Sequence, residues 1–223
     1  MYNFLKFDLG RNALRHIIQT YSIKQIHIPY YLCDVVRHTL VEVGCKPIFY
    51  HIDDEFFPVD NFDRNDYILY PNYWGICGEN VEKLAGLCPR LIIDNAHAFF
   101  DAPKGLACFN AGHKFGFKYS YAFIKGSSMN LPDELLNEEL ILERKNKFLK
   151  LHKKYKNLNL LNIPEDSIPF CYPCLADTIE NADRLVTELK NEGKVIYRYW
   201  NSMPTDFNEY KFYSRLVPIP ITD

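Results

Sequence analysis

The stretch that decides the fold of this chain is LIIDNAH, residues 91–97, and HKFG follows it at residues 113–116. Three consecutive apolar residues are typical of a short buried strand, and Asp94 comes directly after them. In open α/β sheets, ligands bind in the crevice beyond the carboxyl ends of the strands. The sequence therefore predicts an acidic side chain in a binding crevice, with Lys114 following on a later segment.

Asp94 and Lys114 are together the two groups that pyridoxal 5′-phosphate (PLP) chemistry requires. A carboxylate at the pyridine nitrogen keeps the ring protonated and able to accept electrons, and a lysine holds the aldehyde as a Schiff base. Either residue alone is more often a strand-capping acid or an exposed lysine. The ordered pair, in this context, favours a PLP site.

Composition and charge exclude several classes of protein. The chain has 223 residues, of which 48% are hydrophobic, and a net charge of −2. It contains no basic block that would bind nucleic acid, and no apolar run near the ~20 residues of a membrane span. Its seven cysteines are an odd number at scattered positions, which is typical of free thiols in a reducing cytoplasm. We therefore expect a cytoplasmic protein with no metal, nucleic-acid or membrane partner.

The first half of the chain alternates helix-like and strand-like segments. The spacing of apolar residues predicts helices at residues 12–21, 33–43 and 81–87, and strands at residues 24–28, 47–52, 66–70, 91–93 and 121–124. Strands separated by helices imply parallel crossover connections and an α/β sheet. Polar or aromatic clusters follow several of these strands, so we expect them to meet at one rim of the sheet.

The second half has a different character. A long helix rich in Glu and Lys is expected at residues 135–149, and a helix at 179–192 lies between predicted strands at 168–175 and 194–200. We interpret this part as a small α+β domain, and for Trp200 we favour core packing over substrate contact. The predicted boundary divides a large α/β domain at residues 1–150 from a small C-terminal domain at residues 151–223.

A series of motifs resembles those of the DegT-type aminotransferases, a PLP-dependent fold-type-I family that mostly acts on nucleotide-linked keto-sugars. The motifs are GRNAL (10–14), PYYLC (29–33), PIFYHID (47–53), YPNYWG (70–75), LIIDNAH (91–97) and IPFCYPCL (168–175). No single motif is decisive, but their order and spacing are specific, and they cover nearly the whole chain. The resemblance implies an aspartate-aminotransferase-like large domain with a mainly parallel sheet, a small C-terminal domain and a homodimer.

The resemblance also implies roles for the central residues. Asp94 would pair with the pyridine nitrogen, and His97 would hydrogen-bond the phenolic oxygen or the phosphate side of PLP. Lys114 would form the Schiff base and then carry the proton between substrate and cofactor carbons. His113, directly before this lysine, is a further expected cofactor-binding residue.

The remaining cofactor contacts come from the first half of the chain. Gly10, Arg11 and Asn12 would offer backbone N–H groups at a helix start to the phosphate. Tyr31 is the aromatic residue expected to stack on the cofactor ring, and Asn72 would line the edge of that ring.

The sequence departs from the family pattern around the phosphate. Ala111 stands where the family has a phosphate-binding serine, which bears directly on how PLP is retained. Lys104 and Lys118 are possible replacements for that serine. Strict alignment also puts Cys33 where the family has an aromatic ring, and the chain lacks a helical segment that members carry after the lysine strand.

The leading prediction is a PLP-dependent aminotransferase of nucleotide-sugar or surface-glycan biosynthesis. It would move an amino group from a small-molecule donor such as glutamate to a keto-sugar. A degenerate, inactive homologue that serves as a binding subunit is one alternative, which Ala111 and the missing segment motivate. A PLP lyase or desulfurase-like enzyme is another, because His113-Lys114 is similar to the signature of the cysteine desulfurases.

Overall fold

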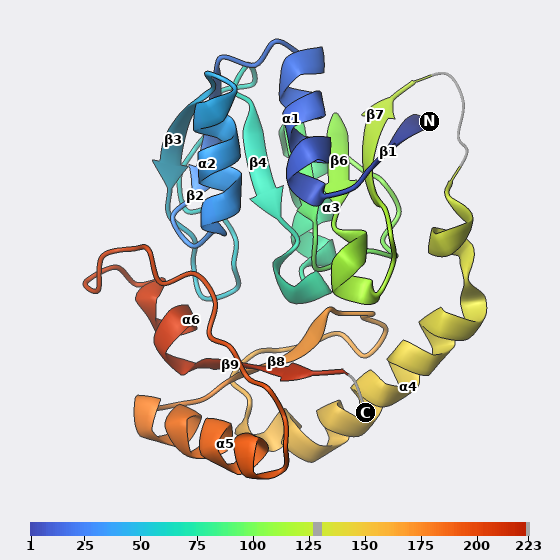
Figure 1. The fold of residues 1–223 in the computed structure, drawn as a ribbon. Helices are drawn as coiled ribbons and strands as arrows, with labels where there is room; N and C mark the ends of the chain where they lie inside the picture. Colours follow the sequence, from blue (N-terminus) through green and yellow to red (C-terminus); the bar gives the residue numbers. More distant parts are fainter. Residues whose placement is uncertain (127–130, 222–223) are drawn as a thin grey trace.

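A seven-stranded sheet forms the centre of the computed structural model, which describes residues 1–126 and 131–221 (Figure 1). The strands are β1 (Tyr2–Phe7), β2 (Gln25–Pro29), β3 (Lys46–Tyr50), β4 (Ile68–Pro71), β5 (Leu91–Asn95), β6 (Ala107–Asn110) and β7 (Ser120–Lys125). They lie in the order β1-β7-β6-β5-β4-β2-β3. Strands β2 to β6 run parallel, whereas β7 is antiparallel to both β6 and β1. The predicted α/β class with a mainly parallel sheet is confirmed.

Helices cover both faces of this sheet, which explains the unbroken apolar runs of its central strands. The helices α1 (Gly10–Thr20) and α2 (Asp34–Glu42) pack on one face, and α3 (Gly78–Leu87) lies on the other (Figure 1). On β5, Ile92 packs into the first layer, while its two neighbours pack into the second. Successive side chains of a strand point to opposite faces, so a strand buried on both sides is apolar throughout.

The C-terminal part of the chain begins with a long helix, α4 (Glu138–Tyr155). The side chain of Asn137 caps it by accepting a hydrogen bond from the backbone N–H of Leu140, 3.0 Å away. Acidic residues lie in its first turn and basic residues in its last, as the helix dipole favours. Residue 150, where the sequence predicts a domain boundary, lies within this helix.

A two-stranded antiparallel sheet follows α4. It consists of β8 (Cys171–Leu175) and β9 (Leu216–Pro220), and α5 (Ile179–Asn191) and α6 (Tyr210–Arg215) lie between them in the chain. Short 3-10 helices complete the structure: η1 (Tyr73–Gly75), η2 (Gly112–Phe115), η3 (Asp133–Leu136) and η4 (Lys156–Leu158). Within the described ranges, no helix is long and apolar enough to cross a membrane.

The predicted strand at residues 194–200 is wrong, because β9 pairs with β8 instead. Residues 194–200 have β-forming side chains but no hydrogen-bonded neighbour strand, whereas β9 carries Pro218 and Pro220. Proline is unusual in a central strand but is tolerated where its missing N–H would face away from a partner. Strands β1 and β6 and helix α6 were not predicted either.

Candidate active site

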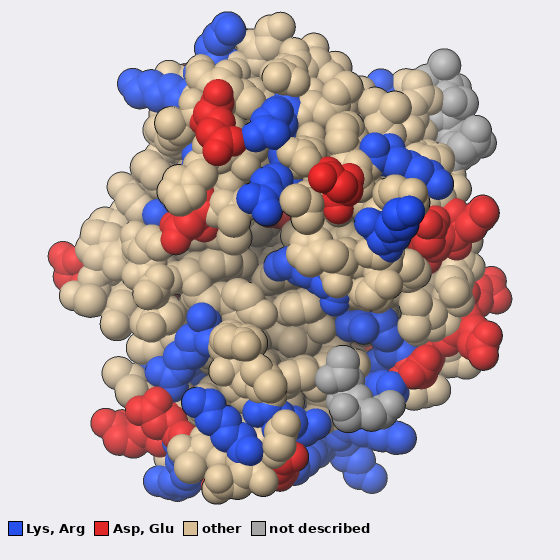
Figure 2. Space-filling view, viewed as in Figure 1, with Lys and Arg blue, Asp and Glu red and all other residues tan. Residues whose placement is uncertain are grey.

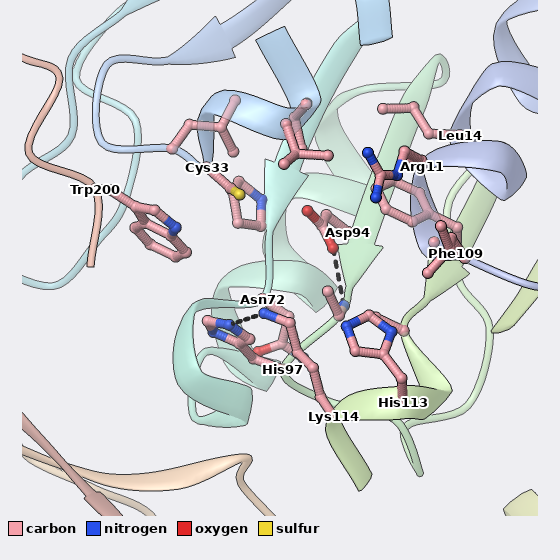
Figure 3. Close-up of a pocket in the computed structure, with 18 residues that line it drawn as sticks. Arg11, Leu14, Cys33, Asn72, Asp94, His97, Phe109, His113, Lys114 and Trp200 are labelled. Atoms are coloured by element: carbon pink, nitrogen blue, oxygen red, sulfur yellow. Dashed lines mark hydrogen bonds between the residues drawn. The ribbon is translucent and has the colours of Figure 1, made fainter. Parts of the chain in front are cut away.

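A cavity of about 190 Å³ lies beyond the carboxyl ends of β4, β5 and β6, where the sequence predicts a binding crevice. The segments that follow these strands form one side of it, and the starts of α1 and α2 form the other (Figure 3). It brings together predicted residues from four separate parts of the chain: Gly10, Arg11, Asn72, Asp94, His97, His113 and Lys114.

Lys114 enters the cavity from η2, the turn that follows β6. Its Nζ lies 2.7 Å from Nε2 of His97 and 5.2 Å from the centre of the Phe170 ring. Burial lowers the pKa of Lys114, and the negative charge of Asp94 acts in the opposite direction. A lysine is nucleophilic only as the free amine, so a lowered pKa suits it for attack on a carbonyl carbon at neutral pH.

His97 is held between aromatic rings. Its imidazole stacks 5.0 Å from Phe170, 5.1 Å from Trp74 and 5.5 Å from Trp200, measured between ring centres. Burial lowers the pKa of His97 well below its usual range, and the charge of Lys114 lowers it further. The ring is therefore neutral, and its Nε2 is available to accept a hydrogen bond from the Lys114 amine.

Trp74 and Trp200 both have positive φ angles, 58° and 62° respectively. Bulky residues avoid this region unless the surrounding packing imposes it, and such strain clusters at functional sites. Their indole rings stack on each other at 5.5 Å. Trp200 also lines the cavity, so it has a place at the site in addition to its predicted role in core packing.

Asp94 is the last residue but one of β5, and its carboxylate turns into the cavity (Figure 3). Its Oδ1 accepts a hydrogen bond of 2.8 Å from the backbone N–H of Ala96. Burial raises the pKa of Asp94 to about 6, although this hydrogen bond and the charge of Lys114 lower it. A buried carboxylate with a raised pKa is stabilised by a cationic partner, such as a protonated ring nitrogen.

The start of α1 forms the opposite end of the cavity. Leu9 at the N-cap offers no side-chain hydrogen bond to the first turn, and that turn contains no acidic residue. Helix N-termini attract anions because their first N–H groups are unpaired and the helix dipole is positive there. Arg11 and His113 line the cavity beside this helix start, so the positive charge of Arg11 and several N–H groups converge at one end.

Gly10 allows α1 to start against the end of β6. A Cβ atom at this position would lie 2.9 Å from the backbone oxygen of Asn110 and 3.4 Å from Cβ of Ala111. Ala111 is buried and lines the cavity, so no hydroxyl group occupies the place of the expected serine.

Comparison with solved structures identifies the architecture. No protein-family model matches the sequence, and a search of curated proteins finds no match. A Streptococcus pneumoniae protein described as a sugar aminotransferase, in its PLP form, superposes with a TM-score of 0.72 at 13% identity, over 99% of this chain and 82% of its own. A DegT/DnrJ/EryC1/StrS aminotransferase from Brucella abortus gives 0.70 at 14% identity, over 98% and 80%. The sugar aminotransferase CalS13 from Micromonospora echinospora gives 0.69 at 11%, over 98% and 82%.

The chain has the fold of the fold-type-I PLP-dependent aminotransferases. The resemblance that the sequence motifs indicate is therefore confirmed at the level of the fold. The superposed region includes nearly the whole chain, so both the sheet and the C-terminal part belong to this architecture.

Two residues predicted to contact the cofactor lie elsewhere in this fold-type-I structure. Tyr31 is fully buried in the core, stacked 5.8 Å from Tyr73, and Cys33 lines the cavity instead. The backbone N–H of Asn12 donates to the oxygen of Leu9 at 3.0 Å, so it is not free to bind an anion. Tertiary packing, which a local motif does not reveal, decides both positions.

Other expected contacts are engaged or distant. Asn72 lines the cavity, but its Oδ1 accepts from the N–H of Cys77 at 3.0 Å and its Nδ2 donates to Asp101 at 2.8 Å. Lys104 pairs with a glutamate of α3, and Lys118 lies on the exposed side of the neighbouring loop. Neither of these lysines lines the cavity, so neither replaces the missing serine.

The aromatic residues that hold His97 were not predicted from the sequence. Trp74 lies inside the YPNYWG motif and Phe170 inside the IPFCYPCL motif, so both were within segments of recognised importance. Aromatic residues are common in cores, and nothing local separates a ring that orients a histidine from one that only fills space. Arg144 of α4 also lies close to Lys114 and Phe170.

Proposed function

We propose that this protein is a PLP-dependent aminotransferase that transfers an amino group to a keto-sugar. One observation carries the proposal. A lysine amine with a lowered pKa and a buried carboxylate face the same cavity, at the carboxyl edge of a sheet whose fold is that of the fold-type-I aminotransferases. The two groups are Lys114 and Asp94, the pair that PLP chemistry requires.

The groups that line the cavity fit each part of PLP. Lys114 would hold its aldehyde and Asp94 its ring nitrogen. The uncapped start of α1, together with Arg11 and His113, would hold its phosphate, which compensates for the missing serine. When bound, PLP supplies an electron sink that makes the carbon bound to the donor nitrogen acidic.

Lys114 is proposed to carry the proton in both half-reactions. Its amine is next to the cavity, and neutral His97 accepts a hydrogen bond from it at 2.7 Å, which fixes its orientation. The rings that stack on His97 restrict its movement, so the lysine is positioned before a substrate arrives. His97 thus acts as a positioning residue for Lys114.

Asp94 is proposed to maintain the protonation of the cofactor ring. Its pKa of about 6 lies below neutral pH, so the carboxylate is ionised at pH 7 even before a cation arrives. A protonated ring nitrogen would give this buried charge a partner and lower its pKa further.

The structural neighbours support a sugar as the amino acceptor, because two of the most similar ones are described as sugar aminotransferases. The proposed amino donor is an amino acid with a side-chain carboxylate, such as glutamate. We also propose that the protein acts in the cytoplasm as a homodimer, as the sequence resemblance implies, in the biosynthesis of nucleotide sugars or surface glycans.

The test is the visible absorption spectrum of the protein after PLP is added and excess is removed by desalting. Wild type, Lys114→Ala and Lys118→Ala are compared, since Lys118 is an exposed lysine nearby. We expect a retained band, trapped on residue 114 by borohydride, in wild type and Lys118→Ala but not in Lys114→Ala. Nucleotide-linked keto-sugars with glutamate should then produce an amino sugar.

Three other results would count against parts of the proposal. A folded protein that retains no PLP would indicate the degenerate binding subunit. Turnover of cysteine but not of keto-sugars would indicate the desulfurase-like alternative. A PLP adduct that forms equally well in Lys114→Ala would remove Lys114 from its proposed role.

A further inference from the structure

A second cavity, of about 420 Å³, lies beside the start of α6. Residues of the loop that follows β3, within positions 51–59, form one side of it, and residues 206–209 form the other. None of the residues that line the cavity at the strand ends lines this one. A ligand bound here would therefore take no direct part in the proposed reaction.

The lining of this second cavity is acidic. Asp53, Asp54, Asp206 and Glu209 line it, whereas no Lys or Arg occurs among the described residues that do so. By contrast, Lys and Arg side chains border the hollow between the sheet and the C-terminal part (Figure 2). Carboxylates gathered around a cavity focus the electric field there, so they raise the local concentration of small cations.

Glu209 has an acceptor oxygen that the protein does not use. Its side chain is fully buried, and its Oε1 accepts hydrogen bonds of 2.9 Å from the backbone N–H of Ile52 and from Nδ1 of His51. Its Oε2 is also buried, with no hydrogen-bond partner among the described residues. A buried carboxylate is normally paired or fully hydrogen-bonded, since its lost hydration is otherwise uncompensated. Because Glu209 lines the cavity, a donor that enters the cavity can supply the missing partner.

The remaining carboxylates differ in how far they are engaged. Oδ1 of Asp53 accepts from two backbone N–H groups of its own loop, and Asp54 forms an ion pair with Lys211, which does not line the cavity. Asp206 is exposed, and in the described parts of the chain its side chain forms no hydrogen bond or ion pair. One unengaged carboxylate thus lies at the rim of the cavity, in addition to the buried Oε2 of Glu209.

The arrangement of these oxygens suits an organic cation better than a metal ion. A bound calcium or magnesium ion needs several oxygens that converge to within about 2.5 Å of one point. Among the described residues, no group of three or more His, Cys, Asp or Glu side chains could hold a metal ion. An alkylammonium group donates up to three hydrogen bonds to oxygens about 3 Å away, and its carbon chain can reach a second carboxylate.

We propose that this second cavity binds a small linear diamine. One ammonium group donates to Oε2 of Glu209, and the other pairs with Asp206 at the rim. Val59 and Phe207, which also line the cavity, contact the carbon chain between the two charges. The ligand class is thus an alkane diamine or polyamine that is doubly charged at neutral pH. Such a ligand joins the loop after β3 to the residues before α6, so it stabilises the contact between the two parts of the chain.

Butane-1,4-diamine provides the test. Its binding is measured by isothermal titration calorimetry on the purified full chain at ~0.15 M salt, where weak non-specific charge pairs are screened. PLP is not added, because a primary amine would also react with its aldehyde. Glu209→Gln should weaken diamine binding about 10-fold or more, the loss expected for a hydrogen-bonded charge. Glu188→Gln, at an exposed position of α5 outside the cavity, should leave it unchanged.

A pair of variants at the rim protects the test from a folding defect in Glu209→Gln. Asp206 is exposed, so a neutral or a basic residue is tolerated there. Asp206→Asn should weaken diamine binding roughly twofold, and Asp206→Lys roughly fivefold. Butylamine, which has a single ammonium group, should bind the wild type more weakly than the diamine does.

Four results would overturn the proposal: no saturable binding by the wild type, wild-type affinity in a folded Glu209→Gln, equal affinities in the two Asp206 variants, or displacement of the diamine by an equal concentration of Mg²⁺. The outcomes for this cavity and for the proposed function are separable. Lys114→Ala should bind the diamine as the wild type does, because Lys114 does not line the second cavity. A wild type that retains no PLP would refute the aminotransferase function, while the diamine titrations still decide the role of Glu209.

Discussion

Replacement of Asp94 by Asn is expected to stabilise the PLP-free protein at neutral pH. Burial raises the pKa of Asp94 from 3.8 to about 6, so the folded state binds its proton more tightly than the unfolded state does. The stabilisation from that proton is fully present below about pH 4 and is lost as the pH rises through 6. A shift of about two units corresponds to about 3 kcal/mol, and an asparagine does not incur this loss.

Urea denaturation of the PLP-free proteins measures this difference. Asn can still accept the hydrogen bond from the N–H of Ala96, so the comparison isolates the charge. The free energy of unfolding of Asp94→Asn should exceed that of wild type by an amount that grows between pH 4 and pH 7 and levels at about 3 kcal/mol. Asp206→Asn, at an exposed position, should follow the wild type at every pH.

Two results would refute this reasoning. A gap between Asp94→Asn and wild type that does not change with pH would mean that Asp94 does not titrate in this range. A variant less stable than wild type at pH 7.5 would mean that the ionised carboxylate is already well compensated without a ligand. Addition of PLP should reverse the order, because a ligand stabilises only the protein that binds it.

Four further substitutions, one of them a control, test the local geometry. Gly10→Ala should lower the free energy of unfolding by about 1–3 kcal/mol, because its Cβ would meet the backbone oxygen of Asn110 at 2.9 Å. The control is Gly86→Ala, where nothing lies within 4 Å of the added Cβ. It should raise the free energy of unfolding by up to about 1 kcal/mol in the same urea titrations. Tyr31→Phe should keep both stability and PLP affinity, since its buried hydroxyl has no hydrogen-bond partner among the described residues and the side chain lies outside the cavity. Loss of PLP binding would restore its predicted stacking role. Ala111→Ser should tighten PLP binding in a fluorescence titration, and an unchanged affinity would place the phosphate away from this residue.

Much of the fold could be predicted from local pattern. The strands β2 to β5 and the helices α1 to α3 are all close to their predicted ranges, because their apolar residues recur with the periods of a buried strand and a half-buried helix. Strands β1 and β6 and helix α6 escaped prediction, and so did β9 with its prolines. Its pairing with β8 joins segments about 40 residues apart, which no local window contains.

Only part of the candidate site was predicted from the sequence. Asp94 was found because it follows a predicted apolar strand, and Lys114 because it follows that acid as the second group that PLP chemistry requires. Both line one cavity. The contact of Lys114 with His97 and the rings that hold that histidine were not found. They depend on distances between segments, as does the fully buried place of Tyr31.

The sequence by itself determined the class of fold and the edge of the sheet at which its polar residues gather. Alternation and apolar runs are local properties, and parallel strands necessarily bring their carboxyl ends together. Only the tertiary structure decided which of those residues meet, because side chains such as Trp200 and Arg144 reach the site from the C-terminal part by packing. That packing depends on shape and burial summed over the whole chain, which the order of residues encodes but no single motif displays.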